Sequence, residues 1–193
     1  MKKIALTQRI IENEPYFEIR EALDINWGKL LEEIGFEPVI FPIEYDFKKL
    51  QFDGVILTGG NDLYSLSMNN TDKKRDDFEK EIIAFCIQKR IPVLGVCRGM
   101  QIINEYFAGT LKQIQNHAGT RHLLDNGQEV NSYHNFAIDE LGENLEVIAI
   151  SQDGVIEVIK HKKYKIFAQM SHPEREKPFN TEEIANIQDF FNH

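Results

Sequence analysis

The chain has 193 residues, of which 42% are hydrophobic and 27% charged, the size and composition of one globular domain with a sizeable core. Its net charge of −9 argues against nucleic-acid binding, which depends on clustered Lys and Arg. No run of eighteen apolar residues occurs, and the apolar run after Lys3 stops at Thr7, too soon for a signal peptide. With only Cys86 and Cys97 as cysteines, we expect a soluble cytoplasmic protein with reduced thiols and no membrane or nucleic-acid partner.

Short apolar runs alternate with amphipathic stretches, the pattern of βαβ units packed on a parallel sheet. The polar segments Asn61–Asp72 and Asn116–Gln128 are expected to be loops beside the site, and nothing divides the single α/β domain predicted over 1–193. The predicted elements, in chain order, are a strand at Ile4–Leu6, a helix at Glu18–Ile34, strands at Pro38–Pro42 and Phe52–Leu57, a helix at Asp72–Lys89, a strand at Pro92–Val96, a helix at Gly99–Phe107, strands at Val130–Ile138, Leu145–Ile150, Val155–Ile159 and Ile166–Gln169, and a helix at Glu182–Phe191.

Cys97 lies between Gly95 and Gly99, where a buried strand turns into a helix. This is the pattern of a nucleophile elbow, in which small neighbours allow other chain segments to approach closely. The amides at the start of the following helix favour a thiolate over a thiol. The alternative for any free cysteine is a small buried hydrophobe, and Cys86, inside an amphipathic helix, fits that description better.

A base and an oxyanion hole can be placed around this elbow. Pro173 favours an extended backbone at His172, so that His172 and Glu174 project to the same side, as a general base and the carboxylate that orients it. A solvated surface turn is the alternative for this isolated segment. Gly59-Gly60, at a strand end, and the Arg98 amide are the candidate donors to an oxyanion.

Three motifs together resemble the class I glutamine amidotransferase family: Gly95–Gln101, Thr58-Gly59-Gly60 and Ser171–Glu174. The resemblance spans nearly the whole chain, and Val130–His134 is similar to the Val-Asn-Ser-x-His segment of the stand-alone γ-glutamyl hydrolase branch. It implies a flavodoxin-like three-layer α/β sandwich with a central, mostly parallel sheet, and hydrolysis of a γ-glutamyl amide. By this resemblance the roles are a Cys97-His172-Glu174 triad, an oxyanion hole at Gly60 and Arg98, and contacts to the γ-glutamyl substrate from Gly59, Gln101, Asn131, Ser132, Tyr133 and His134.

The leaving group is indicated less directly. Thr7-Gln8-Arg9, the segment Tyr16–Arg20 and Trp27 resemble the start of capsule-associated family members that hydrolyse γ-glutamyl-CDP-amidate. That substrate ranks first, ahead of small γ-glutamyl amines. Arg9 and Arg20 are expected to reach its diphosphate and Tyr16 to stack on its base, although all three can equally be ordinary solvated residues. Lys73-Lys74-Arg75 is expected to be a solvated helix start.

No phosphate loop, metal-ligand pattern or dinucleotide fingerprint is present, so neither a cofactor nor a metal is expected. His134 lacks the Pro-Glu companion of His172 and is a weaker candidate base. The other histidines, namely His117, His122, His161 and His193, are expected at the surface or in loops. Two alternatives remain open: a glutaminase subunit that delivers ammonia to a separate synthetase, and a non-catalytic sensor on the same fold. The hydrolase branch favours an enzyme that needs no synthetase partner.

Overall fold

The computed structural model describes residues 1–193. No helix in it is long and apolar enough to cross a membrane. Its elements are β1 (Lys3–Leu6), β2 (Arg9–Asn13), β3 (Glu18–Ala22), α1 (Asn26–Ile34), β4 (Glu37–Ile40), a 3-10 turn η1 (Phe47–Lys49), β5 (Gly54–Leu57), α2 (Tyr64–Ser67), α3 (Asn70–Lys89), β6 (Val93–Val96), α4 (Arg98–Tyr106), β7 (Leu111–Gln113), β8 (Ala118–Leu123), β9 (Glu129–Tyr133), β10 (Phe136–Ile138), β11 (Leu145–Ile150), β12 (Ile156–His161), β13 (Ile166–Gln169), a 3-10 turn η2 (Pro173–Arg175) and α5 (Thr181–Asn192).

A seven-stranded sheet with the order β11-β12-β13-β6-β5-β1-β4 forms the centre of the molecule. Strands β4, β1, β5, β6 and β13 run parallel, and β12 pairs antiparallel with both β13 and β11. Counted among the parallel strands alone, the order is 2-1-3-4-5, which is the flavodoxin-like arrangement. The mostly parallel sheet expected from the sequence is therefore confirmed.

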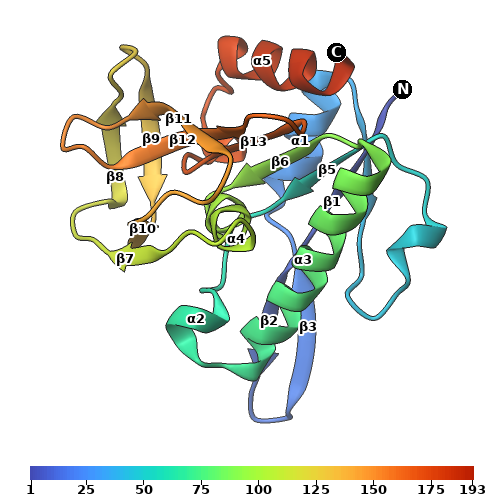
Figure 1. Cartoon of the computed structure of the whole chain (residues 1–193). Coiled ribbons are helices and arrows are strands. Elements are labelled where there is room, and N and C mark those ends of the chain that lie inside the picture. The colour runs from blue at the N-terminus through green and yellow to red at the C-terminus, as the bar shows by residue number, and fades with distance from the viewer.

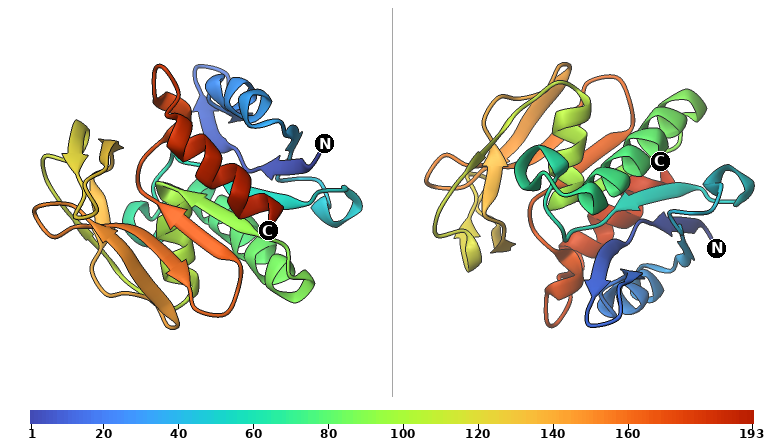
Figure 2. Two further views of the ribbon diagram at one scale, coloured as in Figure 1. Left: turned by 90° about the horizontal axis from the view of Figure 1, so that it is seen from above. Right: turned by 90° about the horizontal axis from the view of Figure 1, so that it is seen from below.

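Helices cover both faces of this sheet (Figures 1 and 2). Helices α3 and α4 pack on one face around Val55, Ile82 and Ile103, and α1 and α5 pack on the other around Trp27 and Phe191. The central strands β1, β5 and β6 are buried on both faces, which accounts for their continuous apolar sequences. The two cores make the sandwich three layers thick.

The segment β7–β10 forms a smaller lobe beside β11 and β12 (Figure 1). In it β8 pairs with β9, and β7 pairs with β10, both antiparallel. A bridge between Leu124 and Ser151 joins this lobe to the central sheet. The lobe places the end of β9 near the carboxyl ends of the parallel strands.

Four expectations from the sequence are wrong. The helix predicted at Glu18–Ile34 begins only at Asn26, because Glu18–Ala22 pairs with Arg9–Asn13 in a hairpin and this strand pairing overrides the helical spacing. The predicted loop Asn116–Gln128 contains β8, and Asn61–Asp72 contains α2 and the start of α3. The strand predicted at Val130–Ile138 is split into β9 and β10, which pair with different partners.

Helix α5 carries a buried carboxyl, Glu183, which accepts a hydrogen bond of 2.5 Å from Gln169 Nε2 on β13. Burial raises the pKa of Glu183 to about 7, although the Gln169 hydrogen bond opposes this, and the charges of Glu176 and Glu174 raise it further. An acid with a folded pKa above its unfolded value stabilises the fold less as pH rises. Between about pH 4.5 and 7, this single group should cost roughly 3 kcal/mol of unfolding free energy.

The Glu183→Gln variant should therefore flatten the pH dependence of stability. The free energy of unfolding is measured with denaturant at about pH 5 and about pH 8. Relative to the wild type, the variant is expected to be more stable at the higher pH than at the lower. Glu182→Gln, at the exposed neighbouring position, is the matched control and should follow the wild type. If the free energy of unfolding depends on pH in the same way in Glu183→Gln and the wild type, the raised pKa of Glu183 is refuted.

Candidate active site

Cys97 stands at a strained turn between β6 and α4. Its φ of 53° and ψ of −104° lie outside the ordinary regions for a residue with a side chain, as at a nucleophile elbow. A Cβ at Gly99 would come within 2.0 Å of Leu57 O, and one at Gly95 within 2.7 Å of the Gly99 carbonyl group. The two glycines are therefore required by close backbone approach, as the sequence predicts.

His172 follows β13 and is brought to the cysteine by the neighbouring strand β6. Its Nδ1 lies 2.7 Å from Glu174 Oε1, and His172 and Cys97 line the same cavity. Burial alone would lower the pKa of His172, but the hydrogen bonds and charges of Cys97 and Glu174 outweigh it and raise this pKa to about 9. The imidazole thus holds a proton well above neutral pH between two acidic partners. Glu174 is 1% exposed, so the alternative of a solvated surface turn is wrong.

The backbone of His172 is held by Asn131 on β9. Asn131 Oδ1 accepts from His172 N at 2.8 Å, and Asn131 Nδ2 donates to His172 O at 2.8 Å and to Glu176 Oε1 at 2.7 Å. Tyr133 adds an edge-on contact to the imidazole at 5.5 Å between ring centroids. A buried amide with all these bonds satisfied fixes the segment that carries His172.

Gly60, on the loop after β5, and Arg98, at the start of α4, line the same cavity as Cys97. Arg98 is the first residue of α4, so its N–H has no partner within the helix, and no described hydrogen bond uses Gly60 N–H. Arg75 holds this loop from behind: its guanidinium donates to Thr58 O at 2.7 Å, to Gly59 O at 3.3 Å and also to Gly60 O. With the carbonyls turned toward Arg75, the loop amides are left free for a ligand.

Arg75 belongs to a buried ion cluster that the sequence interpretation missed. Glu79 lies 3.0 Å from Arg75 Nε and also pairs with the Arg98 side chain, which pairs with Asp76 as well. All four side chains are almost inaccessible, so the expectation of a solvated helix start is wrong for Arg75, although Lys73 and Lys74 are exposed. The spacing of Arg75, Asp76 and Glu79 on one helix face was the available signal.

A cavity of about 440 Å³ opens beside the sulfur of Cys97. A second one, of about 170 Å³, lies next to it and shares Arg9, Gly60 and Arg175 with the first. Arg9 is exposed and has no ion-pair partner, whereas Arg175 faces Asp24 at 3.6 Å and covers the Tyr133 ring. The site therefore offers one unpaired cation at the junction of the two cavities.

The structure separates the predicted substrate residues into two groups. Gln101, Tyr133 and His134 line the larger cavity, and Gly59 lines the smaller one. Ser132 is fully buried and donates to His117 O at 2.5 Å, and like Asn131 it bonds the protein itself rather than facing the cavity. The side chains of Asn131 and Ser132 therefore position the backbone of His172 and His117.

Of the three residues predicted to contact the leaving group, only Arg9 lines the cavity beside Cys97. Arg9 lies at the base of the β2–β3 hairpin, which Asn61 docks through two hydrogen bonds to the backbone of Ile10. Tyr16 is 85% exposed at the hairpin tip, and Arg20 is exposed and paired with Glu18. Neither lines the cavity beside Cys97.

The remaining predicted cysteine and histidines have mixed outcomes. Cys86 is completely buried, and burial raises the pKa of its thiol to about 12, so it is a core residue as expected. His193 is exposed as expected. His117 lies in a loop as expected, although it is buried. The surface or loop assignment is wrong for His161, which is buried at the end of β12, and for His122, which is half-buried on β8. Long-range strand packing decides their burial.

Residues 24–192 match the family model of glutamine amidotransferase class-I, and the chain belongs to this family. It is 41% identical over 188 residues to the γ-glutamyl-CDP-amidate hydrolase of Campylobacter jejuni, covering 94% of each chain. It is also 31% identical to the carbamoyl phosphate synthase small chain of Clostridium perfringens, over 72% of this chain and 40% of that protein. A glutamine amidotransferase structure from Thermotoga maritima shares the fold, with a TM-score of 0.66, 15% identity, and coverage of 97% and 83%.

Proposed function

We propose that this protein is a single-domain cysteine hydrolase that cleaves γ-glutamyl-CDP-amidate into glutamate and CDP-amidate. The observation that carries the proposal is that Cys97, at the strained turn, and His172, which is bonded to the buried Glu174, line one cavity. The likeness to the Campylobacter jejuni hydrolase over nearly the whole chain supports the substrate. The unpaired Arg9 supplies a positive charge where a diphosphate would lie.

The reaction follows from the placement of these groups. The Cys97 thiolate attacks the γ-carbonyl carbon, and the oxygen takes up negative charge facing the N–H groups of Gly60 and Arg98. His172, protonated and oriented by Glu174, gives its proton to the departing nitrogen as the C–N bond breaks. Water, deprotonated by His172, then attacks the γ-glutamyl thioester, and glutamate and the free thiol are released.

The glutamyl part has a place in the larger cavity. Gln101 donates its amide to Phe136 O at 3.0 Å, which leaves its side-chain oxygen as an acceptor for an α-ammonium group. Tyr133 is partly exposed and lines the same cavity. These contacts would fix the γ-carbonyl above the sulfur, and productive geometry is worth several kcal/mol of barrier.

A substrate comparison tests the proposal. Glutamate release is measured with γ-glutamyl-CDP-amidate, with glutamine and with small γ-glutamyl amines, and kcat/KM should be highest for the first. CDP should inhibit competitively and cytidine much more weakly, because the diphosphate carries the charge that Arg9 recognises. The amidotransferase-subunit alternative, favoured by the likeness to a synthase small chain, predicts fast hydrolysis of glutamine alone. Binding without hydrolysis of any of these amides would instead indicate a sensor.

Gly59 should be intolerant of any side chain. In Gly59→Ala, the added Cβ would lie 2.7 Å from His172 Cε1 and 3.5 Å from Cys97 Cβ, so the imidazole must move. Displacement of about 1 Å at a catalytic group costs on the order of 10²-fold in kcat. Gly28→Ala, on α1 with no atom within 4 Å of its Cβ, is the matched control and should retain full activity. Equal kcat for the two variants would contradict this placement of the base.

A further inference from the structure

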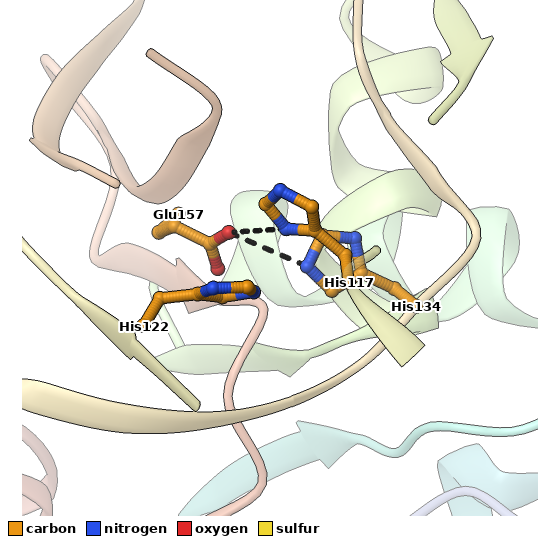
Figure 3. A group of neighbouring side chains, drawn as sticks. All are labelled: His117, His122, His134 and Glu157. Carbon is orange, nitrogen blue, oxygen red and sulfur yellow. Dashed lines mark ion pairs between the residues drawn. The ribbon is translucent and has the colours of Figure 1, made fainter. Parts of the chain in front are cut away.

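Three histidines and one glutamate converge in the lobe beside the central sheet. His117 precedes β8, His122 lies on β8, His134 follows β9 and Glu157 lies on β12 (Figure 3). One potential ligand atom from each lies within 4.8 Å of all the others. The four residues are scattered through the sequence, so only the fold brings them together.

The polar atoms at the centre of this cluster have no hydrogen-bond partner. His117 Nδ1, His134 Nε2 and both carboxylate oxygens of Glu157 are buried without one, and the three side chains are at most 3% exposed. A buried polar atom that stays without a partner destabilises the fold. A single cation among them would satisfy these atoms together.

The separations fit tetrahedral coordination. Glu157 Oε1 lies 3.4 Å from His117 Nδ1 and 3.3 Å from His134 Nε2. A tetrahedron with metal–ligand bonds of about 2.0–2.1 Å has edges of about 3.3–3.4 Å. The His122 ring centroid lies 4.0 Å from that of His117, and a ligand nitrogen of His122 lies within 4.8 Å of the other three ligand atoms. These distances are too long for strong charge-assisted hydrogen bonds and suit ligands that share an ion.

The outer nitrogens of two histidines are already oriented by acceptors. His117 Nε2 lies 2.8 Å from Asp153 Oδ2, and Asp153 is in turn held by Ser151. His134 Nδ1 lies 3.1 Å from Phe136 O. A carboxylate or carbonyl on the far ring nitrogen fixes the tautomer so that the near nitrogen presents its lone pair.

We propose that His117, His122, His134 and Glu157 bind one zinc ion. Three imidazoles and a carboxylate suit Zn²⁺, whereas Mg²⁺ and Ca²⁺ prefer oxygen ligands. Four protein ligands leave no open position, so the ion is structural and joins the β8–β9 hairpin to β12. The sequence-based expectation of no metal site is revised, because it rested on the absence of a compact motif.

This site would also support the cavity beside Cys97. Phe136 O accepts both from His134 Nδ1 and from Gln101 Nε2, so one carbonyl oxygen holds the proposed ligand histidine and the cavity-lining glutamine. The preceding residue, Tyr133, contacts His172. The zinc proposal does not depend on the proposed function, because its test reads metal content and stability.

Metal analysis of the purified full chain tests the site directly. Protein from zinc-supplemented cells should contain about one zinc ion per chain, and its removal by a chelator should lower Tm, with zinc restoring it. Substitution by Co²⁺ should give the intense visible absorption of a tetrahedral site. Asp153→Asn should weaken zinc affinity on the order of 10- to 100-fold, and Glu157→Gln should weaken it further.

Two controls make the result specific. The same measurements in a Cys97→Ser chain exclude zinc held by the Cys97 thiolate, and stoichiometry should be unchanged there. His161→Gln removes a buried histidine outside the cluster, so it separates general destabilisation from ligand loss, and that variant should keep its zinc. Metal-free protein whose Tm does not respond to zinc, or equal zinc affinity in wild type and Glu157→Gln, would overturn the proposal.

Discussion

The Cys97→Ala variant is expected to lose γ-glutamyl hydrolysis by a factor on the order of 10⁶ in kcat, the scale seen when the nucleophile of a catalytic triad is removed. Without the sulfur no thioester forms, and the free amides of Gly60 and Arg98 alone give little catalysis. Glutamate release under single-turnover conditions measures the loss. The fold should survive, because the substitution removes one small side chain.

Cys86→Ala is the matched control, since Cys86 is the second of the two cysteines and is buried in α3. It should retain activity and lose modest stability from the small cavity. Iodoacetamide should modify Cys97 in the wild type and leave Cys86 untouched, because the pKa of Cys86 is raised to about 12 by burial. Hydrolysis that persists in Cys97→Ala would refute the nucleophile.

The Glu174→Gln variant is expected to lower kcat on the order of 10⁴-fold, comparable with the loss when the orienting carboxylate of a triad becomes an amide. The amide keeps the shape and a hydrogen bond to His172 Nδ1 but loses the charge that steadies the imidazolium. The pKa of His172, about 9 in the wild type, should therefore fall. Ring-proton NMR titration of His172 and steady-state kcat measure the two effects.

The Glu174→Gln substitution should also change how the free energy of unfolding depends on pH. The raised His172 pKa stabilises the fold fully below its unfolded value near 6.5, and this contribution is lost as pH rises through about 9. In Glu174→Gln, the contribution of His172 to the free energy of unfolding should therefore fall more near pH 6 than near pH 9. Glu129→Gln, at an exposed carboxylate on β9, is the control and should match the wild type in kcat and His172 pKa. An unchanged His172 pKa in Glu174→Gln would contradict the assignment.

The elbow and the parallel core were predictable because their information is local. Glycines on both sides of Cys97, the apolar strand before it and the amphipathic helix after it all lie within a few residues. The same holds for His172 and Glu174, whose spacing around Pro173 sets their common side. The order of these motifs along the chain then indicated the family and its sheet.

Only the tertiary structure decided which polar side chains are buried and what they contact. The Arg75 anchor behind the Gly59-Gly60 loop and the backbone role of Asn131 both depend on partners distant in sequence. His117 and Glu157 look like ordinary polar residues until the folded chain brings them together. Local patterns fix backbone periodicity and turns, whereas burial and electrostatic partners are properties of the packed chain, because they arise from contacts that no short segment contains.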